Sequence, residues 1–350
     1  MTTTTKSALP VVLGTLAVGA PEYVAQGARI NIVEDLEAII DVLLKHGHHQ
    51  LDTARVYGLG TAEQLIGSIN WQEKGITIGT KMLPAHPLMP EITGAHTLES
   101  IRKALMTSLK ALNTKKIDIW YLHGPDRTVP FEVTLKAIDD LYREGHFARF
   151  GISNYMAAEV AEMAVICKER GYVQPSVFQG IYNAVHRLVE PELFHTLRKF
   201  NIAFYGFNPL AGGFFTDRYS SADATPEPGS RYDPTTLLGK GYRSRFWKPE
   251  FFAALAEVRT VATAHGLTMQ EIAIRWVSHH SLMNREAGDA VIIGGSSVKH
   301  IEENLVDLEK GSLPEQVLTA LDAAWAAVKG YSSDYYFPIG WSAKEALKRS

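Results

Sequence analysis

Short apolar runs alternate with segments of helical periodicity over most of the chain. Strand-like runs fall at about residues 11–16, 49–53, 76–80, 117–122, 147–152, 176–180, 201–207 and 290–294. Between them, apolar residues recur at helical spacing, for example at Val33, Leu36, Ile40 and Leu43. Eight such strand–helix repeats predict an α/β fold, a (β/α)8 barrel of the TIM type, in which the carboxyl ends of all strands share one face.

The pattern predicts a single barrel domain over residues 1–350, with a core at about 11–310 and a C-terminal helix and tail at 311–350. A doubly wound sheet would be expected to carry a Gly-x-Gly-x-x-Gly turn after its first strand, and that turn is missing. Residues 211–247 lack clear periodicity and are predicted to form a long loop after strand 7. The tail is rich in aromatic residues, and we expect it to cover the barrel mouth.

Composition limits the classes of partner. The formal charge of −3 and the lack of a basic stripe argue against a nucleic-acid binder. No uninterrupted apolar run is long enough to cross a membrane. The single cysteine, Cys167, falls at a helical packing position and fits a reducing compartment, so we expect a cytoplasmic protein. Pro10 and Gly14 interrupt the apolar start of the chain, which we interpret as the first strand rather than an export signal.

Four residues with complementary chemistry follow three successive strand-like runs. Asp52 and Tyr57 follow the second run, Lys81 ends the third and His123 follows the fourth. A barrel would bring them into one pocket, where a phenol can deliver a proton to a carbonyl oxygen as the carbonyl receives a hydride. We expect Lys81, held by Asp52, to lower the pKa of Tyr57 towards neutrality. His123 would orient the substrate oxygen. Each residue alone is more often structural, but their joint position favours a catalytic set.

These four residues resemble the catalytic tetrad of the aldo-keto reductase superfamily. Residues 151–155 (Gly-Ile-Ser-Asn-Tyr), Gln179 and residues 207–213 (Phe-Asn-Pro-Leu-Ala-Gly-Gly) are similar to cofactor-site motifs of that family. Residues 121–126 and 242–248 are most similar to its aflatoxin-aldehyde reductase branch. The resemblance covers nearly all of the chain from 11 to 337 in the expected order, and it implies an NADP-dependent oxidoreductase that reduces aldehydes or ketones.

The resemblance also assigns residues to an NADPH cofactor. Those expected at the nicotinamide are Ser153, Asn154 and Gln179 on its carboxamide and Phe207 on its ring. Those expected at the pyrophosphate are Asn208, Pro209, Leu210, Gly212, Arg218 and Arg231. Those expected at the adenosine 2′-phosphate are Ser296, Ser297, Lys299, His300 and Asn304. Hydroxyl groups, an ammonium and a helix N-terminus suit a phosphate dianion, which favours NADPH over NADH.

On the substrate side, the resemblance implies contacts from His123, Tyr242 and Arg245. Relatives grip acidic or dicarbonyl substrates with an additional tail arginine, and Pro338 stands at that position here. We therefore expect a small-molecule aldehyde or ketone that is larger or less polar. The branch often forms dimers, so a homodimer is expected. Histidines within residues 46–49 are interpreted as turn residues rather than metal ligands, and no metal site is expected.

Two other functions use the same residues. One is an NADPH-binding, redox-sensing regulatory subunit with slow turnover, which resembles the potassium-channel β subunits. The chain has no extended N-terminal region for channel inactivation, and this weighs against that alternative. The other is a biosynthetic oxidoreductase that works in the oxidative direction, because the same acid acts as a base in reverse.

Overall fold

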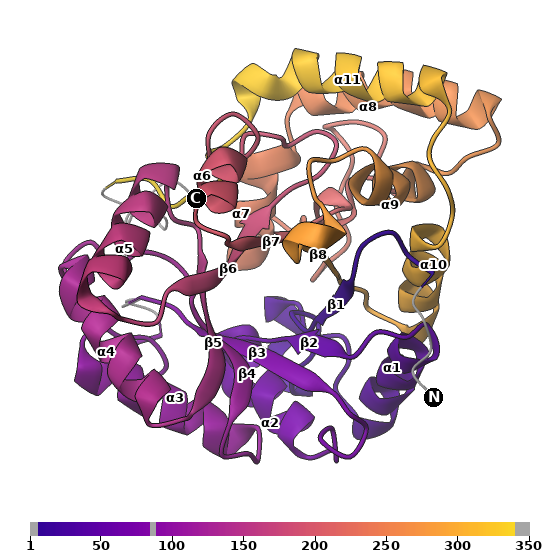
Figure 1. Ribbon diagram of the computed structural model, residues 1–350. Coiled ribbons are helices and arrows are strands. Elements are labelled where there is room, and N and C mark those ends of the chain that lie inside the picture. Colours follow the sequence, from indigo (N-terminus) through magenta and orange to yellow (C-terminus); the bar gives the residue numbers. More distant parts are fainter. Residues whose placement is uncertain (1–5, 85–88, 340–350) are drawn as a thin grey trace.

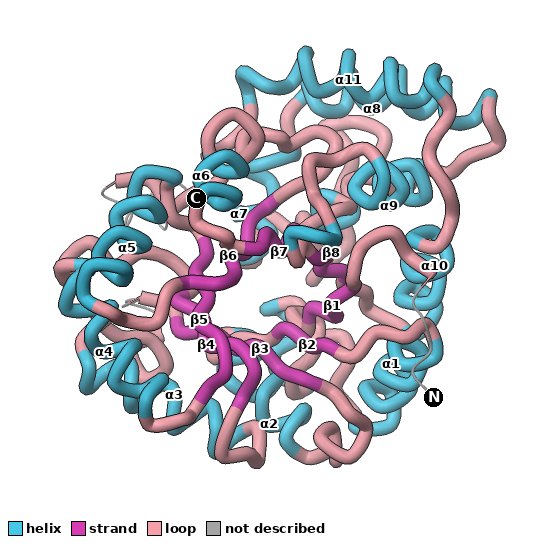
Figure 2. The backbone as a smooth tube through the Cα atoms, viewed as in Figure 1, coloured by secondary structure: helices cyan, strands magenta, loops and turns pink. Residues whose placement is uncertain are grey.

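The structure, a computed structural model, describes residues 6–84 and 89–339. Eight parallel strands close a barrel in the order in which they occur along the chain (Figures 1 and 2). The strands are β1 (Val11–Gly14), β2 (Gln50–Asp52), β3 (Thr77–Met82), β4 (Ile117–Leu122), β5 (Phe147–Ser153), β6 (Pro175–Ile181), β7 (Ala203–Phe207) and β8 (Ala290–Ile293). The barrel closes where β1 pairs with β8, with Val12 opposite Ile292. The predicted fold class is therefore confirmed.

The described residues also form helices, most of which surround the barrel in a ring (Figure 2). They are α1 (Val33–Lys45), α2 (Thr61–Gly67), α3 (Leu98–Ala111), α4 (Phe131–Arg143), α5 (Ala157–Arg170), α6 (Leu193–Lys199), α7 (Leu237–Phe246), α8 (Pro249–Ala264), α9 (Met269–His279), α10 (Val298–Leu308) and α11 (Glu315–Val328). Several begin at a hydroxyl side chain that accepts a hydrogen bond from the first turn, as Thr97 does for α3 and Ser297 for α10. Helix α11 lies along α8 outside the ring (Figure 1).

The alternation of side chains along each strand divides the core into two layers. On β4, Ile119 and Tyr121 belong to the small cluster inside the barrel, whereas Trp120 and Leu122 pack into the larger cluster beneath the helices. All four side chains are buried. Because both faces of every strand are covered, the strands appear in the sequence as short runs enriched in apolar residues, which is why they could be located.

The segment after β7 differs from the prediction. Residues 237–246 of the predicted loop form α7, which starts at the cap Thr236. Its ten residues include two glycines and three cationic side chains, so they carry little apolar periodicity. Tertiary packing stabilises the helix instead, because Tyr242 and Phe246 are buried against the core.

The tail follows α11 as predicted and runs back to the barrel mouth. The backbone N–H of Phe337 donates a hydrogen bond to the carbonyl of Asn154, just after β5. Residues 340–350 of the predicted tail lie outside the described residues. Within the described part of the chain, no helix is both long and apolar enough to span a membrane.

Candidate active site

The carboxyl ends of β2, β3 and β4 bring Asp52, Lys81 and His123 together, with Tyr57 on the turn after β2. Lys81 is fully buried, and its Nζ donates hydrogen bonds to Asp52 Oδ2 (2.5 Å) and to the carbonyl of Thr53 (2.7 Å). The same Nζ lies 5.2 Å from the centre of the Tyr57 ring. The rings of Tyr57 and His123 meet edge-on, with centres 6.1 Å apart. The structure therefore assembles the four residues singled out from the sequence.

Burial dominates the electrostatics of this group. It lowers the pKa of Lys81 and raises the pKa of Asp52, and the ion pair between them opposes both shifts. Burial also raises the pKa of Tyr57 well above 10, and the Asp52 carboxylate adds to this shift. The predicted lowering of the Tyr57 pKa is therefore wrong, because desolvation of the phenolate and the Asp52 carboxylate raise this pKa more than the Arg231 cation lowers it. The phenol remains protonated at neutral pH, which is the form that can donate a proton.

His123 is held neutral. Burial, followed by the nearby Lys81 ammonium, lowers its pKa to about 3. Its Nδ1 is buried and has no hydrogen-bond partner within the described residues. A neutral imidazole carries one N–H donor, so this ring can donate to a substrate oxygen without bringing a second positive charge beside Lys81.

The residues predicted to hold the nicotinamide carboxamide are tied to the tetrad. Gln179 Nε2 donates to Asp52 Oδ1 over 2.8 Å, and Ser153 Oγ donates to the Gln179 carbonyl over 2.8 Å. Asn154 Nδ2 donates to the carbonyl of His123, also over 2.8 Å. Asn154 adopts a left-handed backbone conformation with φ of 63°. Asparagine is among the residues that adopt this conformation most readily.

Tyr242, predicted on the substrate side, also contacts residues predicted for the cofactor. Its ring packs on Gly212, where a Cβ atom would overlap it, and its hydroxyl donates to Asn208 Oδ1 over 3.0 Å. Arg231 Nη1 donates to the same hydroxyl over 3.2 Å. Tyr242 thus contacts three residues predicted for the pyrophosphate. It also acts electrostatically on Tyr57, so it lies between the predicted cofactor cradle and the tetrad.

The other residues predicted for the cofactor fall into two groups. Phe207 ends β7 and packs against the cluster inside the barrel, and Pro209 and Leu210 follow it in the same turn. Arg218 is exposed and pairs with Glu227 over 3.3 Å, so it is not brought to the cradle by any contact in the described structure.

The residues after β8 form a polar N-terminus for α10. Ser297 accepts from the backbone N–H of His300, and Ser296 Oγ lies 3.1 Å from His300 Nδ1. Lys299 is exposed and lies 3.7 Å from Glu303. Residues 296–299 line a cavity of about 270 Å³ whose other wall is formed by Ile30, Asp35 and Ile39.

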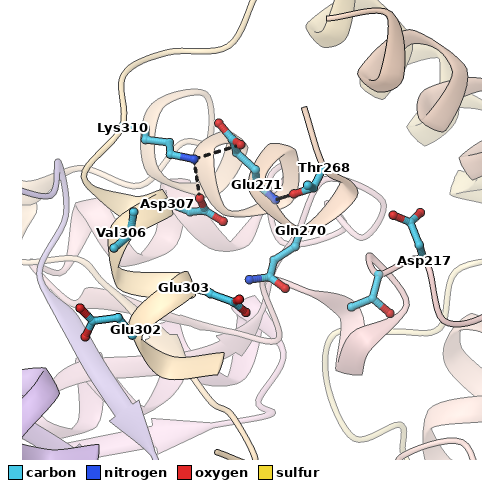
Figure 3. Close-up of a pocket in the computed structure, with 10 residues that line it drawn as sticks. Asp217, Thr268, Gln270, Glu271, Glu302, Glu303, Val306, Asp307 and Lys310 are labelled. Carbon is cyan, nitrogen blue, oxygen red and sulfur yellow. Dashed lines mark hydrogen bonds and ion pairs between the residues drawn. The ribbon is translucent and has the colours of Figure 1, made fainter. Parts of the chain in front are cut away.

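A larger cavity, of about 510 Å³, lies between α9, α10 and residues 216–217 (Figure 3). Figure 3 shows Gln270 of α9 and Glu303 of α10 reaching towards each other, with Asp217 on the opposite side. Its lining is mainly acidic, and Lys310 pairs with Glu271 and Asp307 at one end. None of these residues was singled out from the sequence, because spaced acids on a helix are typical of any solvated face. Among the described residues, no group of three or more His, Cys, Asp or Glu side chains is arranged to hold a metal.

The geometry of a barrel with this tetrad agrees with comparisons with known proteins. The profile of the Aldo/keto reductase family matches residues 10–326, which is most of the chain. This chain belongs to the aldo/keto reductase family. It is therefore an oxidoreductase that acts on carbonyl groups or the corresponding alcohols.

The matches between this aldo/keto reductase and its curated relatives span most of each relative's length. The aldo-keto reductase pigE of Monascus ruber is 41% identical over 336 residues, which are 95% of this chain and 98% of the relative. An aldo-keto reductase of Pseudocercospora fijiensis is 45% identical over 298 residues, 85% of this chain and 100% of the relative. Human aflatoxin B1 aldehyde reductase member 2 is 39% identical over 310 residues, 85% of this chain and 84% of the relative. The predicted similarity to the aflatoxin-aldehyde branch is thereby confirmed.

Proposed function

We propose that this aldo/keto reductase uses NADPH to reduce an aldehyde or ketone to the alcohol, with Tyr57 as the general acid. One observation carries the proposal. A phenol that remains protonated at neutral pH lies beside a buried Lys81–Asp52 ion pair and a neutral histidine, at the carboxyl end of a barrel. This is where active sites of the fold occur, and the set provides a proton donor, a cation and an orienting N–H.

Two unpartnered polar atoms support a bound dinucleotide. Asn208 Nδ2 and Asn304 Oδ1 are buried without a hydrogen-bond partner within the described structure. Asn208 belongs to the predicted pyrophosphate cradle, and Asn304 lies on α10 behind the predicted phosphate site. Buried polar atoms without partners are costly, so a ligand that pairs with both would be stabilised. Bound NADPH would supply a hydride to the carbonyl carbon.

The chain's own residues then manage the charge on the substrate oxygen. The Tyr57 hydroxyl donates its proton to that oxygen as negative charge develops there. Lys81, 5.2 Å from the centre of the Tyr57 ring, stabilises the phenolate that is left behind. The neutral His123 ring donates a hydrogen bond that holds the oxygen in line with Tyr57. Asp52 keeps Lys81 in place throughout.

The polar N-terminus of α10 favours NADPH over NADH. The Ser296 and Ser297 hydroxyls, the Lys299 ammonium and the first turn of a helix of eleven residues are donors that a 2′-phosphate accepts. Asp35 on the facing wall opposes an anion and limits the preference.

Arg245 supports a substrate with a second oxygen function near the carbonyl. Burial lowers its pKa, and the opposing influences come from the phenols of Tyr242 and Tyr232. Within the described structure no carboxylate forms an ion pair with it, so its donors can serve a substrate oxygen. Tyr336 and Phe337 bring aromatic side chains to the tail. Together with the similarity to human aflatoxin B1 aldehyde reductase member 2, these features favour an aldehyde or dicarbonyl with a large aromatic body.

A carbonyl panel tests this function. Purified protein is mixed with NADPH and 4-nitrobenzaldehyde, phenanthrenequinone or succinic semialdehyde, and absorbance at the reduced nicotinamide band is followed. We expect steady turnover, fastest with the aromatic compounds. Tight NADPH binding without turnover on any carbonyl would instead favour a redox-sensing subunit. Turnover only with alcohols and NADP would favour an oxidative, biosynthetic role.

A further inference from the structure

The described tail crosses the barrel mouth and is held at several points. The Lys248 ammonium donates to the carbonyl of Tyr331 over 2.5 Å, and His186 Nε2 lies 2.9 Å from the carbonyl of Ser333. The hydroxyl of Tyr335, a buried residue, accepts from the first N–H of α5. In Figure 1 the yellow end of the chain approaches α5 and α6. The tail is therefore fastened to loops from three different parts of the sequence.

The backbone of Phe337 is hydrogen-bonded through both its N–H and its carbonyl. Its N–H donates to the Asn154 carbonyl over 3.0 Å, and its carbonyl accepts from Arg127 Nη2 over 2.8 Å. Arg127 Nη1 also donates to the carbonyl of Pro338 over 3.1 Å. The Phe337 ring packs directly on Gly124, where a Cβ atom would overlap it. Gly124 immediately follows His123, so this ring packs on the backbone beside the predicted catalytic histidine.

Arg127 is itself fixed by one carboxylate, that of Glu159. Glu159 accepts from Arg127 Nε over 2.6 Å and from Nη2 over 3.1 Å, and it also accepts from the N–H of Met156 at the start of α5. The preceding residue, Asp126, fastens the loop by accepting from Thr128 and from the N–H of His96. A planar guanidinium held in this way presents its remaining donors in one fixed direction.

We propose that Arg127, supported by Glu159, is a positioning residue that fixes Phe337 as a wall of the carbonyl-binding pocket and so sets the affinity for substrate. The inference rests on the proposed carbonyl reduction. Arg127 lies beside Pro338, the tail position at which the resemblance would have placed an arginine, and the Glu159 carboxylate pairs with its charge. It therefore shapes the pocket and does not bind an anionic substrate, a task left to Arg245.

The contacts of Asn154 explain why loss of Arg127 should weaken substrate binding more than it slows the chemical step. Asn154 offers its carbonyl to Phe337, while its side chain donates to the carbonyl of His123. If Arg127 is removed, the tail can move, but the bond between Asn154 and His123 remains. The tetrad should then keep its geometry while the pocket loses a wall.

Kinetics of matched variants test the proposal. For Arg127→Ala we expect KM for an aromatic aldehyde to rise about tenfold or more, as for the loss of charge-assisted hydrogen bonds, with kcat and the NADPH Kd changed by less than ~3-fold. Arg127→Lys should recover part of the loss. Phe337→Ala should raise KM similarly, and combining it with Arg127→Ala should add little, because both changes remove one wall. Arg102→Ala, which breaks a two-pronged pair with Glu144 on the surface, is the control and should change nothing.

Amide hydrogen exchange at Phe337 gives a measurement that needs no turnover. Its N–H should exchange faster in Arg127→Ala than in the parent protein, and Arg102→Ala should not alter the rate. An unchanged exchange rate would show that Arg127 does not hold Phe337 in place. An unchanged KM despite faster exchange would show that holding Phe337 does not affect substrate binding. Equal losses in kcat, KM and NADPH affinity would indicate general damage and also overturn the proposal. If the parent protein reduces no carbonyl, the proposed function fails first, and the exchange result shows whether Arg127 holds Phe337 in place.

Discussion

Gln179 Nε2 donates a hydrogen bond to Asp52 Oδ1 over 2.8 Å, so a residue predicted to hold the cofactor also supports the buried ion pair. Asp52 accepts from Lys81 on one oxygen and from Gln179 on the other. Both bonds lower the pKa of Asp52, against the rise that burial causes. The predicted cofactor site and the predicted proton-donating site are thus one hydrogen-bonded unit.

The pH dependence of reduction follows from the Tyr57 and His123 pKa values. Burial raises the Tyr57 pKa well above 10 and lowers the His123 pKa to about 3. Both groups therefore keep one protonation state between about pH 5 and pH 9, and kcat for reduction should be nearly constant over this range. A fall in kcat with an apparent pKa near 7 would contradict this expectation. It would instead support the lowered Tyr57 pKa that was expected from the sequence.

A second buried ion pair lies under the turn that carries Tyr57. Arg55 Nη1 donates to Glu63 Oε2, and Thr80 Oγ1 donates to the other carboxylate oxygen over 2.6 Å. Glu63 is fully buried, so Arg55→Met would leave a carboxylate unpaired and should lower the free energy of unfolding by ~3–5 kcal/mol. Urea unfolding measures the change.

The double variant Arg55→Met/Glu63→Gln should recover part of that loss, because the stranded charge is gone. Arg102→Ala on the surface should scarcely move the midpoint. A loss in Arg55→Met no larger than in Arg102→Ala would show that the pair does not hold this turn.

Buried neutral histidines should make the protein sensitive to mild acid. Burial lowers the pKa of His186 to about 4, whereas an imidazole in the unfolded chain titrates near pH 6.5. Between these values the unfolded state binds more protons, so stability rises with pH from 4 to 6.5 and is lost as pH falls.

Replacing His186 by Gln, which keeps a donor for the Ser333 carbonyl, should reduce this slope by ~1.4 kcal/mol per pH unit. Denaturant unfolding at several pH values provides the comparison. Above pH 7 the free energies of unfolding of the two proteins should change with pH in parallel. Identical slopes between pH 4.5 and 6 would show that His186 does not titrate as its burial requires.

The cofactor preference can be tested at Lys299. Lys299→Ala should raise the Kd for NADPH about fivefold, the loss expected for one exposed charge pair, and leave the Kd for NADH nearly unchanged. Fluorescence titration of the reduced nicotinamide gives both constants. Equal weakening of the two would place the 2′-phosphate away from the N-terminus of α10.

The sequence predicts the barrel and the meeting of the tetrad for a clear physical reason. Parallel strands buried on both faces are rich in apolar residues, and the carboxyl ends of barrel strands share a face, so Asp52, Lys81 and His123 could be placed together without coordinates. Helix α7 was not predicted, because its glycines and charged residues leave no clear apolar periodicity and tertiary packing stabilises it instead.

Two features of the site depend on distances that no spacing reveals. The direction of the Tyr57 pKa shift depends on how strongly burial desolvates the phenol, and burial cannot be seen from the spacing of residues. The hydrogen bond from Arg127 to the carbonyl of Phe337 joins residues 210 positions apart, and backbone carbonyls have no sequence signature.

The most direct test of the account is turnover by Tyr57→Phe with NADPH and an aromatic aldehyde, measured beside the NADPH Kd of the same variant. The substitution removes only the hydroxyl, so the ring still packs near Lys81 and His123. We predict that kcat falls by ~10²–10⁴-fold, as for loss of a general acid, while the Kd stays within about twofold of the parent value. Turnover at the parent rate would contradict the assignment of Tyr57 as the proton donor.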